Sequence, residues 1–464
     1  MARLLAVALG ALALAAPVQA FTSEELRLPM SDGVRLAATL YLPDGAPPAA
    51  GRPAIMAFHG LGQTRTTSNA VAEAYFVPEG YAVLTVDARG HGESGGLNEL
   101  NGPREVEDVR ELYDWLAVRG DIDPARIGAF GVSLGGGLVW RAATAGVPFA
   151  AIVPTTTWTD LYGALFPGNL SKSGAVLAFL NEIPADRFSP LVNSMRDDLV
   201  RSTNLDRVRE LARERSSIDQ LDRIGAPVFM LQGRRDYAFD LAQVRAAWRS
   251  LPATKRLYIG DLGHPPAANP PAEQPHFLAE VREWFDRWLR GLPNGIDTRP
   301  PIEIAPDPWT GRTSSYRSFP ATRSLHLAFR GRKTIGPNAR VVRTLRLPGR
   351  RLETFGAPVL RVTASSPTGW PRLVAVLSAV SPRGEITVAE GGTQTRGVGA
   401  RPRQVTMRLT DQATLIRRGS KLRLTLATSS TDLLYLPFPL PQAVKATIGR
   451  VRLTLPVLRR PISR

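Results

Sequence analysis

The chain has 464 residues, of which 44% are apolar and 21% are charged, and it contains no Cys. This composition excludes a long disordered protein and a disulfide scaffold, and without Cys there is no thiol nucleophile, iron–sulfur cluster or Cys-ligated zinc. The length exceeds what one hydrophobic core usually supports, so we expect two domains.

The formal net charge of +17 is concentrated towards the C-terminus. Residues 301–464 contain 28 Lys or Arg and 7 Asp or Glu, whereas residues 1–300 contain 30 and 34. This change supports a domain boundary, which we place between residues 298 and 299. A basic domain can contact an anionic cell surface. Because its basic residues alternate with apolar ones on predicted strands, a solvated sheet face is the simpler interpretation, and no nucleic-acid partner is expected.

Residues 1–20 have the pattern of a secretory signal peptide. Arg3 gives a positive start, and residues 4–16 form an apolar run that is too short to cross a bilayer core of about 30 Å. Small residues at Val18 and Ala20 match the preference of signal peptidase. The sequence therefore predicts cleavage near Ala20 and a protein that is secreted to the cell envelope or the medium.

Residues 21–298 alternate predicted strands with predicted helices. The strands lie in residues 26–42 (two strands joined by a turn at 31–33), 54–58, 81–86, 127–130, 151–154, 227–231 and 256–259. Helical periodicity is clearest in residues 105–118 and 275–290. Apolar strands between amphipathic helices predict an α/β domain with a parallel sheet covered on both faces. Residues 155–224 contain only short helical patterns, which predicts a helical cap inserted over the edge of the sheet.

Residues 299–464 change to a period of two. Short predicted strands lie at 324–329, 341–347, 359–363, 373–380, 405–409, 422–427 and 446–455. Many short strands without a long helix predict an all-β domain, a β-sandwich or a jelly roll.

Ser133 lies in a Gly-Val-Ser-Leu-Gly segment at residues 131–135, directly after a predicted strand and before a Gly-rich helix start. In this context the pattern predicts a nucleophile elbow, in which the flanking glycines permit a sharp turn that exposes the hydroxyl. The backbone N–H of Leu134 would then point at a developing oxyanion from a helix N-terminus.

A serine nucleophile needs a base, and the chain has five histidines. His264 follows a late strand in a Gly-rich loop, and the usual Ser–Asp–His chain order favours it over His276. Asp236, a few residues past the preceding strand, is the predicted carboxylate that orients His264. Asp240 is the alternative by spacing. Asp87 is a weaker rival, because its neighbour Arg89 suggests a structural ion pair.

The remaining site residues are predicted from loops and from the cap. The turn at residues 59–63 follows the strand at 54–58, and the N–H of Leu61 is its predicted oxyanion donor. His59 is expected to shape that turn, and His91 to bond locally. Trp158 and Tyr162 could line a substrate pocket, although core packing is the more common role of such aromatic residues.

The chain resembles the serine hydrolases of the X-prolyl dipeptidyl-peptidase and cocaine esterase type. The resemblance rests on the segment Asp-Ala-Arg-Gly-His-Gly-Glu-Ser-Gly-Gly at residues 87–96, on the Ser133 elbow, and on residues 284–301, and it covers nearly all of the mature chain. It implies an α/β-hydrolase fold with a helical cap and a C-terminal jelly roll, and a triad formed by Ser133, Asp236 and His264. Many members have an oxyanion Tyr after the third strand, where this chain has the His59–Leu61 turn, which implies an oxyanion hole formed by backbone groups.

The sequence thus predicts a secreted serine hydrolase that cleaves ester or amide bonds, including Xaa-Pro dipeptidyl bonds, through an acyl-enzyme. No metal or organic cofactor is implied, the partners expected are a small ester, amide or peptide, and the oligomeric state stays open. Two alternatives remain. The protein could be a lipid or polyester esterase that acts at an anionic surface, or a secreted binding protein that uses its β-domain.

Overall fold

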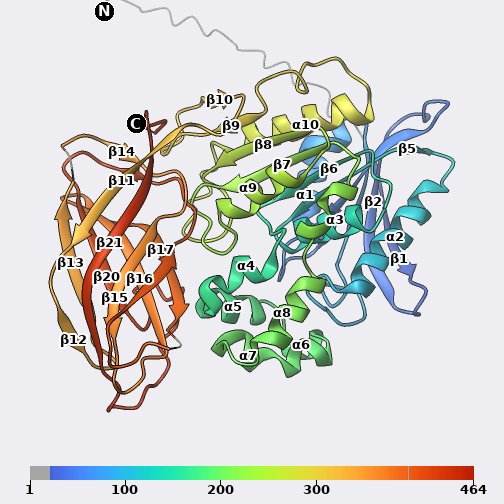
Figure 1. The fold of residues 1–464 in the computed structure, drawn as a ribbon. Helices are drawn as coiled ribbons and strands as arrows, with labels where there is room; N and C mark the ends of the chain where they lie inside the picture. The colour runs from blue at the N-terminus through green and yellow to red at the C-terminus, as the bar shows by residue number, and fades with distance from the viewer. Residues whose placement is uncertain (1–20, 348, 396, 464) are drawn as a thin grey trace, which may run out of the picture.

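The computed structural model describes residues 21–347, 349–395 and 397–463 (Figure 1). The predicted signal peptide, residues 1–20, lies outside the described residues. Two parts are visible, an α/β part with its cap and a β-domain at the C-terminal end of the chain.

A ten-stranded sheet forms the centre of the α/β part, in the order β1-β2-β4-β3-β5-β6-β7-β8-β9-β10. The strands from β4 to β9 in this order are parallel, and β1, β2 and β10 are antiparallel additions at the two edges. Their bounds are β1 (Phe21–Pro29), β2 (Arg35–Pro43), β3 (Arg52–Phe58), β4 (Ala82–Val86), β5 (Ile122–Val132), β6 (Ala151–Thr155), β7 (Val228–Gly233), β8 (Lys255–Gly260), β9 (Ile302–Ile304) and β10 (Ser314–Tyr316).

Helices cover both faces of this sheet, as the apolar strands predict (Figure 1). The long helices are α2 (Pro103–Ala117), α3 (Leu134–Thr144), α9 (Leu241–Ser250) and α10 (Gln274–Leu289), and shorter ones are α1 (Arg65–Val71), η1 (Ala72–Phe76) and η2 (Val77–Glu79). Side chains of α2, α3 and α9 share one apolar cluster, and those of η1 and α10 share another. Along β3, Met56 belongs to the first cluster and Ile55 to the second, so alternate residues of one strand feed two cores.

A cap of short helices lies between β6 and β7, where the sequence predicts one. It consists of α4 (Leu161–Leu165), η3 (Pro167–Asn169), α5 (Ser173–Leu180), η4 (Ala185–Arg187), α6 (Pro190–Ser194), α7 (Arg196–Arg201), α8 (Leu205–Glu214) and η5 (Ile218–Arg223). The cap has an apolar cluster of its own, to which α8 contributes Leu205, Val208 and Leu211 from a single stripe.

The β-domain contains two larger antiparallel sheets and a small one in which β14 pairs with β19. One of the larger sheets has the order β11-β21-β15-β18, with β12 also paired to β21, and the other has the order β13-β20-β16-β17. The bounds are β11 (Thr322–Phe329), β12 (Lys333–Ile335), β13 (Val341–Arg346), β14 (Leu352–Glu353), β15 (Val359–Ser365), β16 (Arg372–Ser381), β17 (Gly384–Gln394), β18 (Arg403–Arg408), β19 (Leu415–Ile416), β20 (Lys421–Ala427) and β21 (Ala446–Leu458). Both larger sheets contribute to one apolar cluster, including Leu360 and Leu424.

Two strands of the large sheet come from the segment that the sequence analysis assigned to the second domain. Ile302 and Ile304 of β9 are fully buried, and β9 pairs in parallel with β8. The α/β sheet therefore continues past the predicted boundary at 298/299, because the two apolar side chains of β9 pack into its core.

No helix among the described residues is both long and apolar enough to cross a membrane.

Candidate active site

Ser133 stands in a sharp turn between β5 and α3. Its backbone has φ 53° and ψ −112°, a conformation that costs a non-glycine residue about 1–3 kcal/mol. The turn is held by the Ser133 N–H, which donates to Thr155 O at 2.9 Å, and by Thr157 Oγ1, which donates to Ser133 O at 2.7 Å. This is the strand–turn–helix geometry that the sequence pattern predicts.

The two glycines that flank the serine are required by close backbone contacts. A Cβ at Gly131 would lie 2.3 Å from Gly135 O, and a Cβ at Gly135 would lie 2.3 Å from Phe58 O. Neither position can hold a side chain unless the backbone moves, so the glycines permit α3 to pack directly against the ends of β3 and β5.

Ser133, His264 and Asp236 form a hydrogen-bonded chain. Ser133 Oγ lies 2.9 Å from His264 Nε2, and His264 Nδ1 lies 2.8 Å from Asp236 Oδ2. The three residues follow β5, β8 and β7 at the carboxyl ends of parallel strands, which meet at one edge of the sheet. The structure therefore brings together the three residues that the sequence analysis singles out.

Asp236 is fully buried and is fixed by backbone donors on both of its oxygens. Its Oδ1 accepts from the N–H groups of Ala238 and Phe239 at 3.0 and 2.9 Å, and its Oδ2 accepts from the His264 N–H at 3.1 Å. These donors hold the carboxylate in contact with the imidazole.

The pKa of His264 is raised above its usual value. Burial of the ring acts in the opposite direction, but the charge and hydrogen bond of Asp236, with a smaller contribution from Glu182, outweigh it. His264 is thus suited to take up a proton from Ser133 and hold it as an imidazolium.

The other predicted candidates have structural contacts. His59 receives a hydrogen bond from the Ala88 N–H at its Nε2 (3.0 Å), and His91 Nδ1 lies 3.2 Å from Arg89 O. Asp240 caps α9 by accepting from the Ala242 N–H at 2.9 Å. These contacts leave the base and carboxylate positions to His264 and Asp236.

Asp87 does form a structural ion pair, but with a different arginine from the one expected. Arg65 Nη1 lies 2.5 Å from Asp87 Oδ2, whereas Arg89 pairs with Asp108 and Asp32. The expected Asp87–Arg89 pair was wrong, because Arg65, the first residue of α1, lies beside Asp87 in the fold.

Leu61 and Leu134 line the same cavity as Ser133. Leu134 is the first residue of α3, and a Cβ at Gly60 would lie 3.5 Å from the Ser133 Cβ, so the 59–62 turn lies directly against the serine. Neither the Leu61 N–H nor the Leu134 N–H donates to an acceptor among the described residues. Both are therefore free to donate to an oxyanion.

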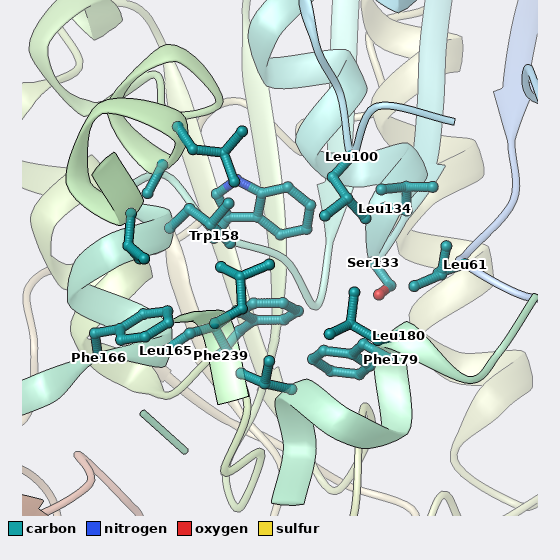
Figure 2. A pocket seen from close by; sticks show the side chains of 16 residues that line it. Leu61, Leu100, Ser133, Leu134, Trp158, Leu165, Phe166, Phe179, Leu180 and Phe239 are labelled. Atoms are coloured by element: carbon teal, nitrogen blue, oxygen red, sulfur yellow. The ribbon is translucent and has the colours of Figure 1, made fainter. Parts of the chain in front are cut away.

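An apolar cavity of about 70 Å³ extends from Ser133 beneath the cap (Figure 2). Ser133 supplies the one hydroxyl of its lining, which otherwise consists of Leu61, Leu100, Leu134, Trp158, Leu161, Leu165, Phe166, Val176, Phe179, Leu180, Leu199, Val208, Leu211, Ala212 and Phe239. Such a lining accepts an aliphatic or aromatic group and offers no partner to a charge.

Trp158 lines this cavity as predicted, but Tyr162 does not. Leu161 and Leu165 occupy the inward face of α4, and Tyr162 lies on the next face, where its ring stacks on Phe166 and its hydroxyl donates to Asn169 at 2.9 Å. Phe179 and Phe239 also line the cavity and were not predicted from the sequence, and both of their rings contact His264 edge-on. The mainly apolar sequence of α5 could have indicated that Phe179 faces an apolar cavity.

A second, more polar cleft of about 570 Å³ meets the apolar cavity at Ser133 and also contains His264. Of the acidic residues in the cap, Glu182 lines this cleft.

A cluster with the residue types of a metal site lies apart from this cleft and consists of His276 and Glu280 of α10 and Glu303 of β9. Arg256 Nη2 lies 2.6 Å from both of its carboxylates, so a guanidinium already occupies the cation position.

Comparisons with known proteins identify relatives of this chain. The sequence model of the X-Pro dipeptidyl-peptidase (S15) family matches residues 32–266. A protein assigned as a Xaa-Pro dipeptidyl-peptidase in Bacillus anthracis is 24% identical over 262 residues, 50% of this chain and 42% of that protein. The cocaine esterase of a Rhodococcus species is 32% identical over 166 residues, 34% of this chain and 28% of the esterase. The chain thus spans less than half the length of these relatives.

The likeness in fold to a solved structure covers most of the chain. The solved structure of a CocE/NonD family hydrolase from Staphylococcus aureus superposes with a TM-score of 0.69 at 15% identity and covers 94% of both chains. The predicted fold class, an α/β hydrolase followed by an all-β domain, is confirmed by this likeness.

Proposed function

Because the chain belongs to the X-Pro dipeptidyl-peptidase (S15) family, we propose that it is a serine hydrolase acting on esters of small apolar carboxylic acids. The observation that carries the proposal is the hydrogen-bonded chain Ser133–His264–Asp236, whose serine opens into a wholly apolar cavity. Ser133 is the nucleophile, His264 the general base and acid, and Asp236 the residue that orients the base.

In the first step His264 Nε2 removes the Ser133 proton as Oγ attacks the ester carbonyl carbon. The Leu61 and Leu134 N–H groups then donate to the oxyanion, whose charge lies at the N-terminus of α3. The tetrahedral intermediate collapses as His264 gives its proton to the leaving oxygen. Water, deprotonated by the same imidazole, releases the acid from the acyl-enzyme.

The apolar cavity favours an acyl group without charge. A dipeptidyl substrate would place an ammonium group near the acyl side of Ser133, where the cavity offers no carboxylate. Glu182, in the neighbouring cleft, is the residue that could hold such an ammonium group. The two substrate classes therefore differ in which of the two cavities they fill.

One plate of substrates tests this function. The protein is given p-nitrophenyl butyrate, Ala-Pro p-nitroanilide and Gly-Pro p-nitroanilide, with Ser133→Ala run beside it. We expect hydrolysis of the ester that is lost in Ser133→Ala. Hydrolysis of the Pro anilides in preference to the ester would replace the esterase by a dipeptidyl-peptidase, and activity that survives in Ser133→Ala would overturn the mechanism.

Action at an anionic envelope surface is a second proposal, favoured by a hollow in the β-domain. This hollow, of about 560 Å³, is lined by four exposed arginines, Arg351, Arg383, Arg417 and Arg418. Export through the predicted signal peptide would place the domain beside such a surface. Binding to anionic vesicles should then weaken as ionic strength rises through about 0.1 M, where the screening length is about 10 Å. Binding that is indifferent to salt would exclude the proposal.

A further inference from the structure

A groove of about 800 Å³ separates the cap from the β-domain and reaches the active site at His264. Its cap wall is α5, which lies on the side of the cap next to the β-domain (Figure 1), and its opposite wall is formed by β17 and residues 432–436. The Gly174 N–H donates to Leu434 O at 2.9 Å and the Leu436 N–H to Ser173 Oγ at 2.8 Å, so the two walls are bonded to each other. These hydrogen bonds therefore fix the two walls of the groove relative to each other.

Glu390 is a buried carboxyl group without a partner in this groove. Its side chain is 0% exposed, it lines the groove, and neither of its oxygens receives a hydrogen bond from any described residue. Asp432 lines the groove beside it. Burial and the neighbouring Asp432 raise the pKa of Glu390 well above its usual value. A buried acid with both oxygens unsatisfied is costly, which indicates that a ligand supplies the missing contact.

The nearby cations are already engaged. Lys172 Nζ donates to the carbonyl oxygens of Tyr237 and Ala238 at 2.6 and 3.1 Å. Arg235 Nη2 lies 3.0 Å from Asp261. Two of the seven acidic residues of the basic segment 301–464 thus face one groove, and neither has an ion pair among the described residues.

Exposed apolar side chains also line the groove. Of the eight large apolar side chains that are exposed among the described residues, three line it: Leu177, Ile386 and Leu433. Exposed apolar side chains gathered around carboxyl groups match a ligand with an apolar body and a positively charged head. A metal ion would instead require more oxygen ligands than Glu390 and Asp432 supply.

We propose that this groove binds an organic ammonium group carried by the leaving group of the ester. The inference rests on the proposed function: His264 gives its proton to the leaving oxygen, and His264 is the residue that the groove shares with the catalytic chain. The acyl group fills the apolar cavity. The acyl carbon–oxygen bond then breaks, and an amino alcohol departs past His264 with its ammonium group held by Glu390 and Asp432.

Matched butyrate esters test this proposal. One series carries a trimethylammonium group on an alcohol chain of two to six carbons, and the other carries a neutral tert-butyl group in the same place. We expect kcat/KM to favour the cationic ester by about ten- to hundredfold at one chain length, the effect of one attraction between opposite charges in a partly buried site. Glu390→Gln should remove this preference without changing kcat/KM for the neutral ester. Glu385→Gln, on the same strand but paired with Arg423 outside the groove, should keep it.

Direct binding of hexyltrimethylammonium to Ser133→Ala, measured by calorimetry, tests the groove independently of turnover and of any effect of Glu390→Gln on folding. Binding in Ser133→Ala that is lost in the Ser133→Ala, Glu390→Gln double variant supports the proposal. If the neutral esters are hydrolysed and the cationic ester is not preferred at any chain length, the inference is overturned and the proposed function stays intact. Loss of turnover for both series, with ammonium binding retained, would overturn the proposed function alone.

Discussion

At the scale of single residues, the charge of Asp236 sets both the orientation and the protonation of His264. The two contacts of Asp236 Oδ2, with the ring and with the backbone N–H of His264, fix the tautomer that leaves Nε2 free to accept from Ser133. Because the pKa of His264 is raised, the ring becomes protonated at a higher pH than an ordinary histidine does. As the pH falls, His264 therefore stops acting as a base earlier than an unperturbed histidine would.

Asp236→Asn tests this coupling through a pH profile. We expect kcat for p-nitrophenyl butyrate to fall by about four orders of magnitude, because the imidazole loses its orienting carboxylate. With the negative charge gone, burial lowers the pKa of His264, so the acid limb of the residual activity should move to lower pH. Asp240→Asn is the control, because Asp240 caps α9 instead. An acid limb that stays in place would separate Asp236 from the titration of His264.

The residues of the site could be predicted where they follow strand ends in sequence. Ser133, Asp236 and His264 come directly after apolar runs, so the parallel sheet itself brings them to one edge. Packing between distant segments decides on which side of α4 Tyr162 lies and which arginine pairs with Asp87. A local sequence pattern does not contain this information.

At the scale of elements, the cap helices form most of the wall of the apolar cavity beside Ser133. Helices α4, α5 and α8 supply most of the apolar side chains around the cavity, and Phe179 of α5 also contacts His264. The size of the cavity therefore depends on how closely these short helices approach Ser133.

Leu165→Ala tests this by enlarging the cavity from α4. The optimum acyl chain of p-nitrophenyl esters should become longer, by about tenfold in relative kcat/KM for one added methylene. The variant should lose about 2–5 kcal/mol of unfolding free energy, since Leu165 is buried. Leu191→Ala, at an exposed cap position, is the control and should keep the original preference. An unchanged chain-length profile in Leu165→Ala would show that the acyl group binds elsewhere.

Helix α2 fixes a loop at the edge of the same cavity. Glu105 is buried and accepts from the Glu99 and Gly102 N–H groups at 2.9 and 2.6 Å and from Asn98 Nδ2 at 2.7 Å. Glu105→Ala would leave these buried donors unsatisfied, so we expect a loss of about 3 kcal/mol in chemical denaturation. Glu107→Ala, exposed on the same helix, should change stability by no more than about 0.5 kcal/mol. Equal effects of the two variants would contradict this role of Glu105.

Periodicity predicted the long elements and missed the short ones. Helices α2 and α10 differ from the predicted ranges by one or two residues at their ends, because each presents a sustained apolar stripe. Strands β9 and β10 have three residues each, too few to show a period, and only pairing with β8 and with each other defines them.

At the scale of the whole molecule, the β-domain supports the loop that carries Asp236. Gln412 Nε2 donates to Asp236 O at 3.0 Å, and the Ala413 N–H donates to Arg234 O at 2.8 Å. Arg234 and Glu353 form an ion pair in which both side chains are fully buried. The two parts of the molecule are thus joined directly at the loop that carries Asp236.

Glu353→Ala would leave the Arg234 guanidinium buried and unpaired. We expect a loss of about 3–5 kcal/mol of unfolding free energy, measured by denaturation, and a lower kcat from displacement of the Asp236 loop. Glu385→Ala breaks the exposed Glu385–Arg423 pair on β17 and should cost no more than about 1 kcal/mol. Full stability in Glu353→Ala would mean that the buried pair does not join the two parts.

Charge and periodicity together predicted that the molecule has two parts, but not how these parts meet. The change from a near-balanced to a strongly basic composition lies close to the end of the α/β part. The Arg234–Glu353 pair and the Glu390 groove consist of isolated residues far apart in sequence. Glu353 and Glu390 are single acidic residues within apolar or basic segments, so neither is recognisable before the fold brings it to its partner.

The central claim is that Ser133 is the nucleophile of an acyl-transfer reaction. The most direct test is to treat the protein with an alkyl fluorophosphonate that fits the apolar cavity, and to locate the adduct by intact mass and peptide mapping. The account predicts one adduct, on Ser133, with loss of ester hydrolysis in proportion to labelling, and no adduct in Ser133→Ala. Labelling at another residue, or ester hydrolysis that persists in fully labelled protein, would contradict it.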